Sequence, residues 1–315
     1  MKRVVSLSLG SASRDHRVVA DFLQEQVAIE RIGTDGDRAK LIELIRQLDG
    51  SVDAFGMGGI DRYIVVNQKR FTFREAEQIA RAANKTPICD GSGLKDTLER
   101  VVVHQLADDP LIRLRRKKVL LVSGVDRFGM AEALVENDCE VVFGDLLFGL
   151  GISVPIRSLA GLERAARILA PILTKLPIRY LYPTGEKQET IKGSRFSKYY
   201  LEADVIAGDF HFIRRYLPDQ LAGKIVLTNT VTEQDKQLLR ERGVSCLVTT
   251  TPHLQGRSFG TNVMEALLVA LHGKKGPLTS FEYLQMIEQL QLQPHIEWFQ
   301  QAERASVDSR YFLPV

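Results

Sequence analysis

Cysteine is scarce in this sequence, and its spacing argues against two kinds of site. The three cysteines, Cys89, Cys139 and Cys246, form no C-x-x-C pair and have no histidine at metal-ligand spacing. Each lies in or beside an apolar run, where a reduced thiol packs as a small hydrophobic side chain. We therefore expect neither a disulfide framework nor a bound metal.

Long apolar runs and a strong net charge are also missing. No segment approaches the roughly 18 consecutive apolar residues that a membrane span needs. Asp15 and His16 follow the basic N-terminal stretch at once, which favours a first strand over a signal peptide. A net charge of +3 is too small to indicate nucleic acid. We expect a cytoplasmic protein with a small-molecule substrate, no membrane or nucleic-acid partner, and a homodimer as one possible assembly.

Strand-like and helix-like stretches alternate along the 315 residues, which are enough for two domains. In the first part the pattern predicts strands over 4–9, 27–32, 52–56 and 86–89, a hairpin over 63–73, and helices over 17–24, 38–48, 74–83 and 94–106. In the second part it predicts strands over 119–123, 139–143, 178–182, 204–207, 225–229 and 244–249, and helices over 130–135, 158–175, 195–202, 211–221, 232–242 and from 261. A helix over 280–291 follows.

This order predicts an α/β protein with two doubly wound parallel-sheet (Rossmann-like) lobes and a cleft between them. We expect residues 1–112 to form a substrate lobe and residues 113–273 to form a dinucleotide-binding lobe. Part of the tail, 274–315, is expected to pack back on the first lobe.

The second lobe opens with half of a mononucleotide-binding unit, a strand, a glycine turn, a helix and a second strand. Gly124 and Gly129 frame the turn, and Asp145 follows 21 positions after the first glycine (145 − 124), where a dinucleotide fold binds the adenosine ribose. Asp126 takes the place of the middle glycine of G-x-G-x-x-G, and its charge opposes a pyrophosphate. Arg127 can offset that charge or hold a phosphate. The alternative is that the glycines only make a tight turn.

Polar loops follow several other predicted strands, and in a parallel sheet these loops meet at one edge. Gly91, Ser92 and Gly93 start a helix whose backbone N–H groups can hold a phosphate or carboxylate of the substrate. Arg257 and Ser258 are further candidates for anchoring an anionic group of the substrate. Thr228 and Asn229 follow a second-lobe strand and are expected on the cofactor side of the cleft.

Five segments together resemble bacterial proteins labelled quinate or shikimate 5-dehydrogenase: SLGSASRDH, DGSGLK, AGDFHFIRRYLP, TNTVT and GRSFGTNVMEA. The resemblance implies a catalytic first lobe, a nicotinamide-binding second lobe and oxidation of a ring alcohol. Such enzymes place a lysine and an aspartate beside the reacting hydroxyl, in N-V-T-x-P and G-x-N-T-D-x-x-G motifs that this chain lacks. Lys95 and Asp61, each after a first-lobe strand, are the candidates for that catalytic pair.

The sequence therefore favours an enzyme, an NAD- or NADP-dependent oxidoreductase acting on a small hydroxylated or carboxylated substrate. Asp145 favours NAD, because its carboxylate would repel a 2′-phosphate. Two other classes stay open. One is a non-redox two-lobed enzyme, such as a transferase with a nucleotide donor, and the other is a small-molecule-binding protein without catalysis.

Overall fold

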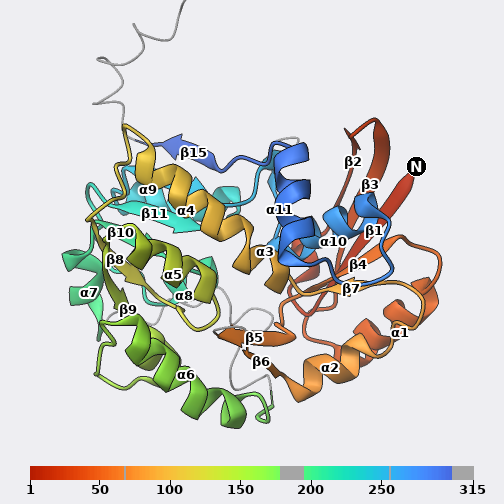
Figure 1. Ribbon diagram of the computed structural model, residues 1–315, viewed down its shortest axis with the longest axis horizontal. Coiled ribbons are helices and arrows are strands. Elements are labelled where there is room, and N and C mark those ends of the chain that lie inside the picture. The colour runs from red at the N-terminus through yellow and green to blue at the C-terminus, as the bar shows by residue number, and fades with distance from the viewer. Residues whose placement is uncertain (67–68, 178–194, 255–256, 300–315) are drawn as a thin grey trace, which may run out of the picture.

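The computed structural model describes residues 1–66, 69–177, 195–254 and 257–299 of the chain. Its strands form two separate main sheets, which lie in two lobes (Figure 1). The protein is thus a two-lobed α/β fold built on mostly parallel sheets, as the sequence predicted. Among the described residues, no helix has the length and apolar character needed to cross a membrane.

The first sheet has the strand order β2-β3-β1-β4-β7. Its strands are β1 (Lys2–Ser8), β2 (His16–Phe22), β3 (Glu25–Gly33), β4 (Ala54–Gly58) and β7 (Ile88–Cys89). β1 pairs in parallel with β3 and β4, and β7 pairs in parallel with β4. The helices and the hairpin of this part are α1 (Arg38–Leu48), α2 (Arg74–Ala80), β5 (Tyr63–Val66) and β6 (Lys69–Thr72). The hairpin turn predicted at 67–68 lies outside the described residues.

The helix predicted over 17–24 is wrong, because this stretch is β2, antiparallel to β3. Val18 is buried between exposed neighbours, which is the period-two pattern of a strand. Leu23 and Gln24 both have positive φ values, 48° and 66°, and turn β2 directly into β3. Two consecutive residues with positive φ form the short turn that suits a hairpin.

The second sheet has the strand order β15-β12-β11-β10-β8-β9. Its strands are β8 (Lys118–Leu121), β9 (Glu140–Phe143), β10 (Val205–Ala207), β11 (Ile225–Thr228), β12 (Cys246–Thr249) and β15 (His295–Trp298). Its helices are α4 (Leu98–Asp108), α5 (Phe128–Glu136), α6 (Leu159–Leu173), α7 (Ser197–Glu202), α8 (Phe210–Arg215) and α9 (Glu233–Glu241). The predicted strand over 178–182 lies outside the described residues.

The tail divides between the lobes. Its end, β15, pairs antiparallel with β12 and so extends the second sheet, while the helix before it packs against the helix that covers the first sheet, in line with the expectation that part of the tail returns there. α11 (Ser280–Gln289) packs against α3 (Ser92–Asp96) and against α10 (Thr261–His272). The predicted helix over 94–106 is two helices, α3 and α4, which meet at Thr97.

α10 was expected to close the second lobe, but it packs across β4 and β1 of the first sheet (Figure 1). Glycines on β4 permit this approach, because a Cβ at Gly56 would lie 3.0 Å from the backbone oxygen of Asn262 on α10. The side chain of Asn262 also donates to Ser6 Oγ over 2.9 Å. The chain therefore passes from the first lobe to the second and back.

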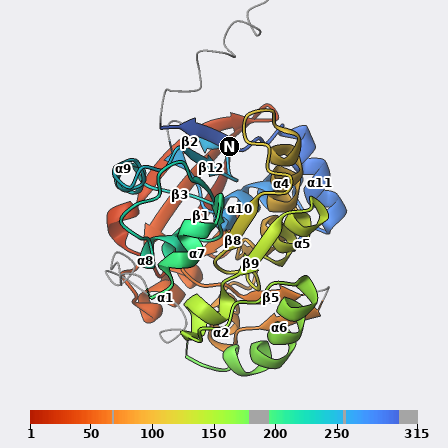
Figure 2. The ribbon, with the colours of Figure 1, turned by 90° about the vertical axis from the view of Figure 1, so that its left-hand side faces the viewer.

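The β5–β6 hairpin leaves the first lobe and contacts α6 of the second, and both views place it near α2 and α6 (Figures 1 and 2). The hairpin therefore spans the junction of the two lobes.

All three cysteines are free and buried.

Gly56→Ala should lower the free energy of unfolding by about 1–3 kcal/mol, because the added methyl group presses on the backbone of α10. Gly149→Ala is the control, since a Cβ there meets nothing within 4 Å. Urea unfolding of both variants measures the difference. Equal stability of the two would show that α10 does not pack tightly on β4.

Candidate functional site

Lys95 lies at the junction of the two lobes, between two carboxylates. Its Nζ is 2.6 Å from Oδ1 of Asp61, in the loop after β4, and 2.7 Å from Oδ1 of Asp126, in the turn after β8. The lysine is 7% exposed. The predicted pair, Lys95 and Asp61, is therefore brought into direct contact. Asp126, predicted only as part of a cofactor turn, joins it from the other lobe.

The charged groups of this cluster shift one another's pKa values. Burial lowers the pKa of Lys95, but Asp126 and Asp61 outweigh it and raise that pKa above its usual value. Burial and the charge of Asp126 raise the pKa of Asp61 to about 7, although Lys95 opposes the shift. Lys95 thus stays an ammonium, while Asp61 holds a proton more readily than an exposed aspartate does. Such shifts, caused by burial and a specific partner, are typical of functional sites.

Arg127 lies beside Asp126, with its Nε 4.0 Å from Oδ2, which agrees with the first of its two predicted roles, to offset that charge. Its side chain is completely buried and forms an ion pair with Glu99 of α4. Its Nη2 also lies 3.3 Å from Oδ2 of Asp209, which follows β10. A buried guanidinium needs such partners, because leaving it unpaired would cost several kcal/mol. Arg127 therefore links the turn to neighbouring elements and is not available to a cofactor.

Asp145 does not face a ribose either. Its carboxylate accepts hydrogen bonds from the backbone N–H groups of Gly124 and Val125, over 3.0 Å and 2.8 Å. Burial raises the pKa of Asp145 to about 6, against these two hydrogen bonds. Two backbone donors of the turn are thus satisfied within the protein.

Gly129 has a packing role at the start of α5. A Cβ at this position would lie 3.0 Å from the Cα of Asp96, so the missing side chain lets α5 approach α3. α3 therefore covers the helix start over which the pyrophosphate was predicted. With Asp126 paired to Lys95 as well, the residues of this turn do not fit a dinucleotide pyrophosphate.

The backbone N–H groups of Gly91, Ser92 and Gly93 were predicted to bind the substrate, but they donate to carboxylates of the protein itself. Gly91 N–H donates to Oε2 of Glu265 over 2.6 Å, and Gly93 N–H is hydrogen-bonded to the same carboxylate. The backbone N–H and the hydroxyl of Ser92 both donate to Oδ1 of Asp90, over 3.1 Å and 2.7 Å. These donors therefore hold the chain's own carboxylates, and no substrate anion has access to them.

Glu265 is a site residue that our sequence reasoning missed. It is 4% exposed on α10, and Tyr283 of α11 donates its hydroxyl to Oε1 over 2.5 Å. Burial, and then the charge of Asp90, raises the pKa of Glu265 to about 7. The available signal was a single carboxylate in the otherwise apolar run VMEALLVAL.

The remaining predicted residues lie elsewhere or outside the described side chains. Thr228 is buried, and its Oγ1 donates to the backbone oxygen of Gly208 over 2.8 Å. Asn229 donates to Oδ2 of Asp209 over 3.3 Å. Both therefore bind strand ends of their own lobe, and Thr228 is not accessible to a cofactor.

Arg257 and Ser258 form the short strand β14, which pairs with β13 (His253–Leu254). Their side chains lie outside the described part of the structure. Their predicted role in anchoring an anion stays a prediction.

A small hollow lies beside Lys95. Its volume of about 10 Å³ is enough for about one water molecule. Its walls come from β5, α3, the turn after β8 and α5, through Tyr63, Val65, Ser92, Lys95, Asp96, Asp126, Phe128 and Gly129. The β5–β6 hairpin therefore closes the space next to the charged cluster.

Residues 93–299 match a family model described as "Domain of unknown function (DUF8754)". The chain belongs to the DUF8754 family. Residues 3–90 match a second model, "Domain of unknown function (DUF8753)", so the two matches meet at the start of α3. No curated protein matches this DUF8754 member.

Solved structures similar to this DUF8754 member include L-tryptophan dehydrogenase from Nostoc punctiforme, with 11% identity, a TM-score of 0.38, and coverage of 92% of this chain and 78% of that one. A solute-binding protein of an ABC transporter from Burkholderia multivorans has 11% identity, a TM-score of 0.37, and coverage of 94% and 98%. A D-allose-bound periplasmic solute-binding protein from Actinobacillus succinogenes has 12% identity, a TM-score of 0.35, and coverage of 96% and 99%. At these TM-scores the likeness says nothing of this chain's ligand.

Asp145→Ala should lower the free energy of unfolding by about 2 kcal/mol or more, because it leaves two N–H groups of the glycine turn without an acceptor. Asp145→Asn keeps an acceptor oxygen and should lose less. Denaturant unfolding measures both. If Asp145→Ala is as stable as the wild type, the carboxylate does not hold the turn, and a ligand-binding role regains its place.

Glu265→Gln should gain stability relative to the wild type as the pH rises. The usual pKa of a glutamate is 4.5, and that of folded Glu265 is about 7, so the folded protein holds a proton that the unfolded chain has lost in between. Wild-type stability therefore falls across this window, by about 3 kcal/mol from this residue. Glutamine cannot ionise.

Unfolding free energies at about pH 5 and pH 8 give the difference between wild type and Glu265→Gln. Other groups that titrate here, such as Asp61, are present in both proteins and cancel. A difference that does not change with pH would contradict the raised pKa.

Proposed function

We propose that this protein binds a small, neutral, hydroxyl-rich molecule where its two lobes meet, through Lys95, Asp61 and Asp126. The observation that carries the proposal is the position of the Lys95 ammonium, between one carboxylate from each lobe and at the wall of the hollow. A ligand that opens the hollow would meet Lys95 and Asp126 in its wall and Asp61 through its ion pair with Lys95.

A purely structural role explains the Arg127–Glu99 ion pair better than it explains the cluster of Lys95, Asp61 and Asp126. The Arg127–Glu99 pair is fully buried and already ties the elements at the lobe junction together. Lys95 and Asp126 instead line the hollow, where an incoming polar group can replace part of their pairing. Buried ion pairs add little net stability, so a second one beside a hollow is better explained by ligand binding.

The charge of the cluster supports the choice of ligand class. One ammonium and two carboxylates sum to one negative charge when Asp61 is ionised and to zero when it is protonated. An anionic ligand is therefore disfavoured here. Hydroxyl groups suit the cluster, because each can donate to a carboxylate and accept from the ammonium.

Binding requires the β5–β6 hairpin to move. The hollow holds about one water, and Tyr63 and Val65 of β5 form part of its wall. The described conformation thus corresponds to a closed form, and a ligand enters when the hairpin leaves α6.

A second candidate is the oxidoreductase that the sequence resemblance implies. Asp61, with a pKa of about 7 and next to an ammonium, suits a group that accepts the proton of a reacting hydroxyl. The glycine turn does not fit NAD or NADP, so these cofactors would have to bind elsewhere. Saturable quenching of NADH or NADPH fluorescence, together with cofactor-dependent oxidation of quinate or shikimate, would favour this candidate over simple binding.

The first experiment is native mass spectrometry of the purified protein, which detects a carried small molecule directly. Calorimetric titration with D-ribose, a neutral polyol, and with shikimate, which carries a carboxylate, then tests the ligand class. We expect D-ribose to bind more tightly than shikimate.

Lys95→Met should weaken D-ribose binding about tenfold or more, because it removes a charged hydrogen-bond donor. Lys236→Met is the matched control, since Lys236 is also 7% exposed and is paired with Glu233 and Glu297 on α9 and β15. Asp61→Asn serves as a second site variant if Lys95→Met does not fold. Equal affinity of the Lys95 and Lys236 variants, or of Asp61→Asn and wild type, would remove the cluster from the binding site.

A further inference from the structure

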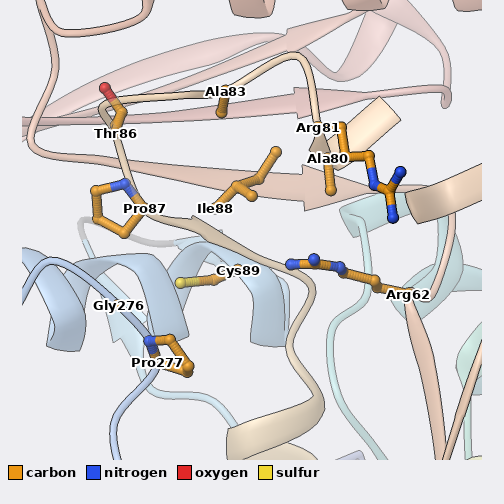
Figure 3. A pocket seen from close by; sticks show the side chains of 10 residues that line it. All are labelled: Arg62, Ala80, Arg81, Ala83, Thr86, Pro87, Ile88, Cys89, Gly276 and Pro277. Carbon is orange, nitrogen blue, oxygen red and sulfur yellow. The ribbon is translucent and has the colours of Figure 1, made fainter. Parts of the chain in front are cut away.

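A second, larger cavity lies at the edge of the first sheet, away from the hollow beside Lys95. It has a volume of about 240 Å³ and lies between β7, the C-terminal end of α2 and the turn at 276–277 (Figure 3). Much of its wall is apolar, from Ala80, Pro87, Ile88 and Pro277. Its volume lies below the roughly 300–1,000 Å³ of pockets for drug-sized ligands, so it suits a ligand with few heavy atoms.

Two arginines line this cavity, and one glutamate holds both of them. Nε of Arg62 donates to Oε2 of Glu77 over 2.8 Å, and Nε of Arg81 donates to Oε1 over 3.1 Å. Within the described residues, neither guanidinium uses its Nη groups in a hydrogen bond to the protein. The ends of both guanidinium groups therefore remain available to a ligand.

Arg62 is held in place before any ligand arrives. Its guanidinium also lies over the ring of Tyr63, 5.0 Å from the centroid, and its side chain is 23% exposed. Figure 3 shows it extending into the cavity toward Cys89 of β7. A fixed guanidinium loses little conformational entropy when it binds a planar anion.

The charges around the cavity disfavour a dianion. Arg62, Arg81 and Glu77 sum to one positive charge. Burial, with the nearby charge of Glu265, raises the pKa of the Cys89 thiol well above its usual value, so this thiol stays neutral beside the ligand. A dianionic phosphate would bring a second negative charge toward Glu77 and Asp90, which favours a carboxylate.

We propose that this cavity binds a small monocarboxylate with an apolar body, whose carboxylate contacts the Nη groups of Arg62 and Arg81. The apolar body lies against the prolines and the aliphatic wall. The site is separate from the Lys95 cluster. Arg62 follows Asp61 in sequence, but its guanidinium binds Glu77 while Asp61 binds Lys95.

Benzoate is a suitable probe, because it joins a carboxylate to an apolar ring, and benzyl alcohol is its neutral counterpart. Titration of the ¹⁵N-labelled protein, followed by NMR, gives both the dissociation constant and the location. We expect saturable shifts from residues of β7 and the end of α2 with benzoate, and about tenfold weaker binding of benzyl alcohol.

Arg81→Gln and Arg62→Gln should each weaken benzoate binding about five- to tenfold, because each removes a charged donor. Arg74→Gln is the matched control, since Arg74 is an exposed arginine on the same helix and does not line the cavity. Arg81 is 77% exposed, so its replacement leaves the fold intact even if Arg62→Gln does not fold.

The proposal is overturned if benzoate causes no saturable shifts up to about 10 mM, or if its affinity in Arg81→Gln equals that in Arg74→Gln. It is also overturned if benzyl alcohol binds as tightly as benzoate, since the arginines would then play no part. Inorganic phosphate binding more tightly than benzoate would replace the carboxylate assignment with a phosphate site.

Discussion

Charge pairing at the junction of the lobes constrains the rest of this structure. Lys95 and Arg127 are buried cations that need carboxylate partners, and loops after the strands supply Asp61, Asp126 and Asp209 while α4 supplies Glu99. Those loops belong to both sheets, so satisfying the charges fixes how the sheets' carboxyl ends face each other. The glycine at position 129 then serves the same purpose, because it lets α5 approach the helix that carries Lys95.

The chain also fills its own anion-binding positions. Backbone N–H groups at the glycine turn and at the start of α3 are donors of the kind that phosphates use. Here Asp145 takes the first set, and Glu265 and Asp90 take the second. At these two places the backbone donors that dinucleotide binding would use therefore already serve the protein's own carboxylates. A ligand would instead contact charged side chains, such as Lys95 and Asp126 in the wall of the hollow.

The sequence predicts the architecture well where burial alone determines it. Runs such as Val119–Ser123 are apolar without alternation, which indicates strands covered on both faces. It predicts β2 wrongly, because a single buried Val18 among polar residues fits two periodicities. The place of α10 was also missed. The helix is apolar around most of its surface, so its sequence does not indicate which of the two sheets it covers.

The candidate site was predicted in part, for a related reason. Because Lys95 and Asp61 each follow a strand, the sequence correctly predicted that they lie close together. The 21-residue spacing correctly predicted that the carboxylate of Asp145 lies at the glycine turn. Spacing alone cannot show whether such a carboxylate binds the ribose of a cofactor or the backbone N–H groups of the turn. Glu265 could not be paired with Gly91, because 174 residues separate them and no local pattern links them.

The position of α10 has a consequence for synthesis of the chain on the ribosome. β1, β4 and β7 all emerge within the first 89 residues, but the helix that covers them ends at His272. Most of the second sheet is translated in between. The apolar face of the first sheet therefore waits through 183 further residues (272 − 89), a delay of about 10–40 s at ordinary translation rates. The first lobe therefore stays uncovered while most of the second lobe is made, and during that interval the bare face of its sheet is available to a chaperone.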